Sequence, residues 1–385
     1  MPTCTNRKRF LAIDGSARSL WRTRGALLKA AVQAGHEVIA CAAMDTSMVD
    51  IQVSNLTDKY KAMGVQFHEL HMQRQGKNPL REVYTLWELW RLMLRLRPDV
   101  VLSYSIKSVL YGSLAARLAE VTHYYSAITG LGYLFVSNSG RKNLFRKAIH
   151  RLLRVALMGN RQVFFQNPDD RDLFLHLGLL RDRNQAVIVN GSGVDLERFS
   201  EVPLPNGPIT FLMIARVQYH KGVVEYVQAA RILKRSYPDI RFQLLGPFDD
   251  HPSAISKSEF QELIQDGVVE FLGGTPDVRP FIAQCHVYVL PSYREGMPLS
   301  ALEAMAMGRP VVTTDVPGCR EIVVNGDNGF LVMAKDSVGL AEAMRRFLEN
   351  PVLVSQMGKR SRQIVEVKYD VKKVVHTMMV TMALS

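Results

Sequence analysis

The chain has 385 residues, more than one hydrophobic core usually holds, so two domains are predicted. Apolar residues make up 47% and charged residues 22% of the sequence, and these values exclude a disordered or fibrous protein. The first apolar stretch, 10–13, is too short for a secretory signal, and no apolar run approaches the roughly 18 residues of a membrane-spanning helix. We therefore expect a cytoplasmic protein.

The net charge of +12 lies entirely in the first half of the chain. Residues 1–195 contain 27 Lys and Arg against 15 Asp and Glu, whereas residues 196–385 contain 21 of each kind. A basic half predicts an anionic partner, either a membrane surface or a phosphorylated substrate. Nucleic acid is disfavoured because no recognition motif accompanies the charge.

In the first half, short apolar runs alternate with amphipathic stretches. Strands are predicted at 10–13, 37–42, 65–70, 100–103, 124–128 and 162–165, and helices at 21–34, 83–96 and 109–119. Strands that alternate with helices of this length predict a parallel, doubly wound sheet.

The second half repeats this arrangement after a linker. Three prolines and a glycine fall within 203–208, and such a segment continues neither a helix nor a central strand. Strands are predicted at 209–214, 241–245, 268–272, 286–290, 310–314 and 330–332, and helices at 223–236, 340–349, 354–367 and 371–382. The predicted architecture is α/β, with two Rossmann-like, doubly wound domains that face a cleft. Their expected bounds are 1–202 and 203–367, and 368–385 is expected to cross back to the N-terminal domain.

Two carboxylates and two cations follow predicted strands of the second domain. Glu295 lies in the loop after the strand 286–290, and Glu303 lies on the helix that begins near Pro298 and ends at Gly308. Arg216 and Lys221 follow the strand 209–214. Because parallel strands end at one edge of a sheet, these side chains are expected at one ligand site. Cations and free N–H groups at a helix start suit a diphosphate, and carboxylates suit sugar hydroxyls.

This pattern resembles family 4 of the retaining GT-B glycosyltransferases. Glu295 and Glu303 match the family's E-x7-E signature, Arg216 and Lys221 match its basic pair, and residues 190–195 match its interdomain loop. Within the family, 213–222 and 289–296 resemble members that extend polyprenyl-diphosphate-linked oligosaccharides. The resemblance implies a UDP-sugar co-substrate, no other cofactor and no metal. It also implies a lipid-linked saccharide acceptor, in bacterial surface-glycan or glycoprotein-glycan assembly.

The resemblance assigns roles residue by residue. Arg216, Lys221 and Glu295 would be catalytic, with the two cations and backbone N–H groups stabilising the leaving diphosphate. Donor-binding residues would be Gly15, Asn190, Gly296, Met297, Pro298, Leu299, Ser300 and Glu303. Acceptor-binding residues would be Lys107, Thr129 and Gly130. Many members carry a histidine after the fifth strand. Here 129–133 fills that region and His123 precedes it, so a structural role is favoured for His123.

The segment 141–155 mixes basic and apolar side chains at helical spacing. Arg146, Lys147, Arg151 and Arg154 are interleaved with leucines, Phe145 and Val155. This composition predicts a helix on an anionic bilayer, hence a peripheral protein on the cytoplasmic face of the inner membrane. The alternative is an ordinary surface helix with a buried apolar stripe.

Two other functions remain open. One is a nucleotide-sugar epimerase on a similar fold, and the other is a catalytically silent, membrane-associated subunit that holds a lipid-linked sugar. The presence of both carboxylates and both cations argues against the silent subunit. A plain NAD-binding protein is disfavoured because no G-x-G-x-x-G follows the first strand.

Overall fold

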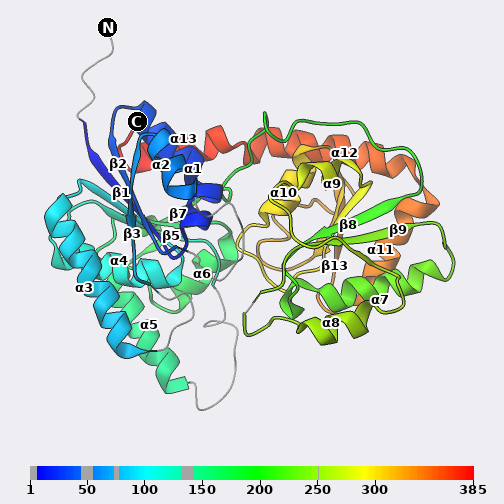
Figure 1. Ribbon diagram of the computed structural model, residues 1–385, viewed down its shortest axis with the longest axis horizontal. Coiled ribbons are helices and arrows are strands. Elements are labelled where there is room, and N and C mark those ends of the chain that lie inside the picture. The colour runs from blue at the N-terminus through cyan, green and yellow to red at the C-terminus, as the bar shows by residue number, and fades with distance from the viewer. Residues whose placement is uncertain (1–6, 45–54, 73–77, 132–142, 250) are drawn as a thin grey trace, which may run out of the picture. The chain divides into compact units, whose positions relative to one another are not determined.

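A computed structural model describes residues 7–44, 55–72, 78–131, 143–249 and 251–385, and for 143–146 it describes the backbone alone. The chain forms two compact units: residues 1–192 with 372–385, and residues 193–371. The division falls at Ser192, whereas the proline-rich segment expected as the linker begins at Pro203. Residues 193–202 thus belong to the second unit (Figure 1).

The N-terminal unit is built on seven parallel strands in the order β3-β2-β1-β4-β5-β6-β7. The strands are β1 (Arg9–Asp14), β2 (Glu37–Ala42), β3 (Val65–Glu69), β4 (Val100–Tyr104), β5 (Tyr124–Ile128), β6 (Val163–Phe165) and β7 (Ala186–Ile188). The connecting helices are α1 (Ala17–Gln33), α2 (Leu56–Ala62), α3 (Pro79–Leu96), α4 (Ile106–Leu118), α5 (Asn143–Met158) and α6 (Pro168–His176). The strands β1 and β4 are buried almost throughout, as central strands of a doubly wound sheet should be.

The C-terminal unit has six strands in the order β10-β9-β8-β11-β12-β13. They are β8 (Thr210–Ile214), β9 (Arg241–Leu245), β10 (Glu270–Phe271), β11 (Val287–Leu290), β12 (Val311–Thr314) and β13 (Gly329–Val332), all paired in parallel. The helices are α7 (Val223–Lys234), α8 (Lys257–Ile264), α9 (Arg279–Ala283), α10 (Leu299–Ala306), α11 (Ser337–Glu349) and α12 (Val352–Ile364). One continuous apolar core joins this sheet to its helices.

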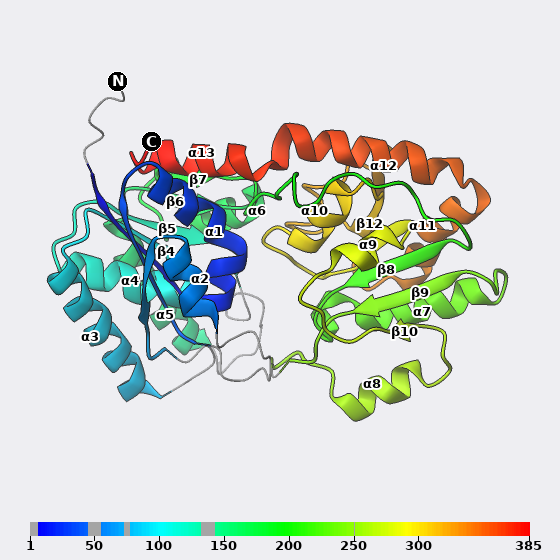
Figure 2. The ribbon, with the colours of Figure 1, turned by 45° about the horizontal axis from the view of Figure 1, so that its top comes forward.

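The last helix, α13 (Val371–Thr381), belongs to the N-terminal unit although it lies at the other end of the chain. Val374, Met378, Met379 and Met382 are buried in the same core cluster as Leu20 of α1. Figure 2 shows α13 beside the sheet and helices of this unit. The first unit therefore takes part of its core from the last residues of the sequence.

Candidate active site

The loops that follow β8, β9, β11 and β12 share the carboxyl edge of the C-terminal sheet, because all four strands run parallel. Open α/β sheets bind their ligands at this edge. Arg216 and Lys221 lie in the loop after β8, and Glu295 lies in the loop after β11. Glu303 lies on α10, the helix that this second loop enters.

Lys221 and Glu295 form an ion pair between two loops that are 74 residues apart in the sequence. The Lys221 Nζ lies 2.5 Å from the Glu295 Oε1, and the Ser292 hydroxyl donates to the same oxygen at 2.7 Å. The two side chains are only 16% and 13% exposed. A pair shielded to this extent is held more firmly than an open surface ion pair.

Two glycines allow the backbone to hold this pair. Gly222 has a φ of +76°, and a Cβ there would lie 2.1 Å from the Pro291 carbonyl oxygen. Gly318 has a φ of +83°, and a Cβ there would lie 2.3 Å from the Glu295 carbonyl oxygen. Any larger residue would push the loops apart, so the close approach depends on glycine at both positions.

The Glu295 carboxyl is ionised in the folded protein. Burial opposes its ionisation, but the charge of Lys221 and the hydrogen bonds from Lys221 and Ser292 outweigh burial and lower the pKa of Glu295. A carboxyl whose pKa is lowered by folding stabilises the protein above its unfolded pKa of about 4.3. That contribution is lost as the pH falls through the lower folded pKa, so the pair is intact at neutral pH.

Arg216 is held by Asp249, a residue of the loop after β9. The Arg216 guanidinium pairs with the Asp249 Oδ2, and the Gln218 amide donates to the same oxygen at 2.6 Å. The neighbouring His220 is hydrogen-bonded to Ser253. Burial, followed by the charge of Lys221, lowers the pKa of His220 to about 4, so its imidazole is neutral at pH 7.

The start of α10 differs by one residue from the sequence prediction. Pro298 was expected as the first helical residue, but it has a φ of −77° and a ψ of 95°, and Leu299 begins the helix. The extended ψ of Pro298 places it before the first turn. Its carbonyl accepts from the Ala301 and Leu302 N–H groups at 3.1 and 3.2 Å.

The predicted donor-binding run 296–300 therefore spans the approach to α10 and its first turn. Gly296 and Pro298 are buried, and Met297, Leu299 and Ser300 are half-buried. The Ser300 hydroxyl contacts the Tyr288 hydroxyl at 2.6 Å, so the serine offers a ligand its backbone N–H. Glu303 is buried in the second turn of α10.

Two family models together cover most of the chain. Residues 20–191 match the glycosyl transferase 4-like domain, and residues 195–364 match the glycosyl transferases group 1 domain. The chain belongs to the GT-B glycosyltransferases. This finding confirms the family resemblance and the α/β class predicted from the sequence.

Two relatives of this transferase have names that specify a lipid-linked sugar as the acceptor. It is 28% identical to the Campylobacter jejuni N,N'-diacetylbacillosaminyl-diphospho-undecaprenol alpha-1,3-N-acetylgalactosaminyltransferase, over 83% of this chain and 86% of the relative. It is 26% identical to the Escherichia coli UDP-Gal:alpha-D-GlcNAc-diphosphoundecaprenol alpha-1,3-galactosyltransferase, over 76% of this chain and 77% of the relative.

Solved structures share the fold of the transferase. Anabaena HepE, solved in complex with UDP and glucose, superposes with a TM-score of 0.77 at 16% identity, over 98% of this chain and all of that chain. Sucrose-phosphate synthase from Thermosynechococcus elongatus superposes with a TM-score of 0.76 at 20% identity, over 96% of this chain and 97% of that one.

The remaining predicted site residues of the transferase lie in its N-terminal unit. Gly15 follows β1, Thr129 and Gly130 follow β5, and Asn190 follows β7, so these residues share the carboxyl edge of that sheet. Lys107, in the first turn of α4, is already paired within the unit. Its Nζ lies 2.7 Å from the Glu82 Oε1 of α3. An acceptor would have to share Lys107 with this carboxylate.

A buried arginine of α1 steadies the loop that contains Asn190. The Arg24 guanidinium donates to the Ser192 hydroxyl at 2.5 Å and lies 4.5 Å from the centre of the Tyr104 ring. Burial lowers the pKa of Arg24. The sequence interpretation missed Arg24 because a single arginine within an amphipathic helix is ordinarily exposed.

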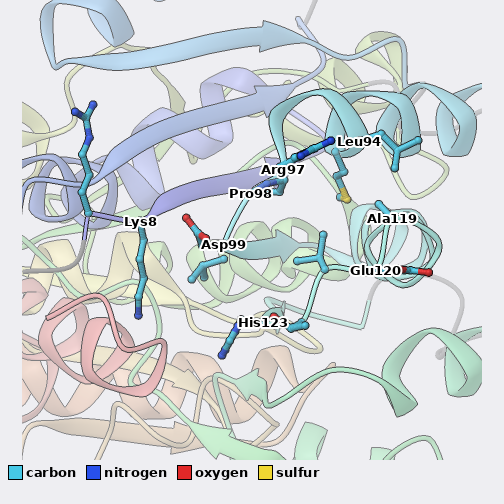
Figure 3. A pocket seen from close by; sticks show the side chains of 13 residues that line it. Lys8, Leu94, Arg97, Pro98, Asp99, Ala119, Glu120 and His123 are labelled. Carbon is cyan, nitrogen blue, oxygen red and sulfur yellow. Dashed lines mark hydrogen bonds between the residues drawn. The ribbon is translucent and has the colours of Figure 1, made fainter.

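A cavity lies at the opposite edge of the N-terminal sheet. Its volume is about 660 Å³, and it is bordered by Lys8 before β1, by Arg97 and Asp99 before β4, and by Glu120 and His123 before β5 (Figure 3). Because these residues precede their strands, the cavity lies away from the carboxyl edge. His123 lines this cavity, so it lies apart from Thr129 and Gly130.

Three basic residues of α5 are exposed to solvent. Lys147, Arg151 and Arg154 are exposed, and the side chain of Arg146 lies outside the described residues. Leu153 and Leu157 are buried against the unit. The helix therefore has a core-facing side, as the surface-helix alternative requires, together with a basic outer side.

The described part of the chain contains no helix long and apolar enough to span a membrane. Over the same residues, no group of three His, Cys, Asp or Glu side chains is arranged to hold a metal ion.

Proposed function

We propose that the protein transfers a hexose or N-acetylhexosamine from a UDP-sugar to a polyprenyl-diphosphate-linked saccharide, with retention of anomeric configuration and without a metal ion. One observation carries the donor assignment. Lys221, Glu295 and Arg216 gather in the loops after β8 and β11, beside the first turn of α10. The acceptor assignment rests on the two relatives that act on diphospho-undecaprenol sugars.

The donor would bind with its diphosphate over the cations. Arg216 is 41% exposed and supplies a planar set of N–H donors, while Lys221 supplies a point charge. The Leu299 and Ser300 N–H groups belong to the first helical turn, where a helix has no internal acceptor for them. Glu295 would orient the hexose hydroxyls, and Glu303 would accept from the ribose.

The reaction replaces one bond at the anomeric carbon with another. The acceptor hydroxyl oxygen bonds to that carbon, the bond to the UDP oxygen breaks, and the acceptor proton passes to a phosphate oxygen of the leaving UDP on the same face. Negative charge grows on the diphosphate as the bond breaks. Cations and N–H groups already aimed at that position stabilise it more than they stabilise the bound donor.

The test is a turnover screen of purified protein with UDP-sugars and polyprenyl-diphosphate-linked acceptors, with the product linkage determined by NMR. Formation of an α-linked product from an α-linked donor supports the proposal. Conversion of the nucleotide sugar to an epimer without acceptor would identify the epimerase alternative. Absence of turnover with every donor and acceptor pair would favour the silent subunit.

Activity is expected to survive EDTA. Arg216 and Lys221 carry the positive charge that a divalent ion supplies in metal-dependent transferases. Initial rates should agree within about twofold before and after chelation, because these charges remain in place. Complete loss of activity, restored by magnesium or manganese, would contradict metal independence.

Two helices of the N-terminal unit support contact with an anionic membrane. Besides the basic residues of α5, α3 exposes apolar side chains at helical spacing: Leu80, Val83, Tyr84, Trp87 and Leu94. The exposed charged residues of α3 are all arginines: Arg81, Arg91 and Arg95. Apolar and aromatic side chains flanked by arginines suit the interfacial region of a bilayer.

Changing Arg146, Lys147, Arg151 and Arg154 together to Glu is expected to weaken binding to anionic liposomes. Each basic residue near such a surface contributes about 1 kcal/mol, and salt screens that attraction. Co-sedimentation with vesicles of anionic and of neutral lipid measures the effect. Turnover on a long-chain lipid acceptor should fall in parallel, and UDP binding should not change.

A matched control reverses four exposed basic residues elsewhere. The control changes Lys59 and Lys61 on α2, Arg235 at the end of α7 and Lys359 on α12. Changing these four residues to Glu alters the net charge by the same amount as the α5 variant does. Equal loss of liposome binding in both variants would assign the effect to net charge. Undiminished binding of the α5 variant would show that α5 is not the contact.

A further inference from the structure

The loop after β9 is fastened to the loop that contains Arg216. The Val217 N–H donates to the Pro247 carbonyl at 3.1 Å, and the Tyr219 N–H donates to the Ser253 carbonyl at 2.9 Å. Backbone bonds of this kind fix the spacing of the two loops. Side chains that reach across from the β9 loop therefore hold defined positions at the carboxyl edge of the sheet.

Asp249 uses this fixed position to reach Arg216. Its Oδ2 accepts from the Arg216 guanidinium and, at 2.6 Å, from the Gln218 amide. The Asp249 side chain is 19% exposed, whereas that of Arg216 is 41% exposed. The guanidinium has five N–H donors, and the contact with Asp249 uses Nη1. Arg216 is thus oriented by the carboxylate on one side and open on the other.

Both cations of the site consequently have a carboxylate of the protein beside them. Lys221 pairs with Glu295 and Arg216 pairs with Asp249. A donor diphosphate brings further negative charge next to these carboxylates. Like charges in a shielded site repel one another strongly, because little water lies between them.

We propose that Asp249 is a resident counter-ion of the donor site, which aims Arg216 and competes with the diphosphate for its charge. This inference rests on the proposed assignment of Arg216 to the diphosphate. Asp249 lowers the affinity for the UDP-sugar and for the UDP product alike, so it limits the residence time of UDP after transfer. It acts through Arg216 and is a positioning residue.

The Asp249→Asn variant tests this role, because the amide keeps the size and one acceptor oxygen of the side chain but loses its charge. UDP titrated into the protein in a calorimeter should bind about 5- to 50-fold tighter to Asp249→Asn, as expected for removal of an unfavourable coupling. The KM for the UDP-sugar should fall as well, and turnover at saturating donor should fall if UDP release limits the rate. The gain should shrink as salt is raised. Asp249→Glu, which keeps the charge, should stay within about threefold of the parent in UDP affinity.

The double variant separates this inference from the proposed function. Arg216→Ala should weaken UDP binding. When Asp249→Asn is added to Arg216→Ala, the fold increase in UDP affinity should be less than half of the increase that Asp249→Asn gives in the parent protein. Asp266→Asn removes the carboxylate from another Asp–Arg pair of the same unit, 2.6 Å from Arg231, and should not change UDP affinity.

Unchanged or weaker UDP binding by Asp249→Asn, with Arg216→Ala still weakening it, would overturn the counter-ion role alone. Undiminished UDP binding by Arg216→Ala would overturn both this role and the diphosphate assignment. An equal gain from Asp266→Asn would assign the effect to net charge and would also overturn the counter-ion role.

Discussion

Lys221→Ala is expected to lower the rate of sugar transfer by roughly 10²–10³-fold, the usual effect of removing one preorganised electrostatic contact. The Lys221 ammonium is held by Glu295 at 2.5 Å and is largely shielded from water. In the proposed mechanism it faces the charge that develops on the departing diphosphate. Single-turnover measurement with saturating UDP-sugar reports the chemical step directly. Near-normal turnover in folded Lys221→Ala would contradict the diphosphate assignment.

The same substitution also removes the partner of the Glu295 carboxylate, so its effect on folding must be separated from its effect on catalysis. An ionised carboxylate left in a shielded position destabilises the protein. Combining Lys221→Ala with Glu295→Gln removes that charge and should recover much of the melting temperature. Turnover should stay low in the double variant, because the cation is still missing. Recovery of turnover together with stability would show that the pair has a structural role only.

Arg309→Leu is expected to lower the free energy of unfolding by about 3–5 kcal/mol. Arg309 is completely buried between α10 and β12. Its guanidinium donates to five backbone carbonyls at 2.8 to 3.1 Å, those of Ile282, Ala283, Met307, Val202 and Pro203. Leucine fills part of the volume but leaves these carbonyls without their donor. A buried acceptor that loses its partner costs about 1–3 kcal/mol, and local relaxation recovers part of the total.

Urea unfolding followed by circular dichroism measures this change. Arg235→Leu is the control, because Arg235 is exposed at the end of α7. This substitution should change the free energy of unfolding by no more than about 0.5 kcal/mol. If the two variants unfold at the same urea concentration, the carbonyl cluster does not contribute to stability. The free energy of unfolding of Arg309→Lys should lie between those of the parent and Arg309→Leu, because an ammonium reaches fewer acceptors than a guanidinium.

The strands were predictable where an apolar run is bounded by polar or turn residues. The structure places Glu37–Ala42, Tyr124–Ile128 and Arg241–Leu245 at the predicted bounds. The short elements α2, α8 and β7 were missed, because their few apolar residues set up no clear period. For α8 a local signal did exist. Ser256 and Glu259 form a reciprocal capping box at its start.

The site was partly predictable for a topological reason. Parallel strands bring their carboxyl ends to one edge, so Lys221 and Glu295 could be expected near each other without knowledge of the pair they form. The contact between Asp249 and Arg216 could not be predicted, because the two residues are 33 positions apart and Asp249 belongs to no recognised motif. The burial of Arg309 could not be predicted either. It stands between Gly308 and Pro310, a context that predicts an exposed turn, yet non-local carbonyls surround it.

The return of α13 to the N-terminal unit has a consequence for biosynthesis. That unit is interrupted after Ser192 and is completed only by residues 372–385, which bury Met378 and Met382 beside α1. On a ribosome that adds about 5–20 residues per second, the intervening 179 residues take roughly 9–36 s. During that interval the half of the protein made first lacks part of its own core, while the half made later can already close. The C-terminal unit should therefore finish folding before the N-terminal unit, although it is translated later. Until α13 has been made, the N-terminal unit should be the part of the protein that chaperones bind.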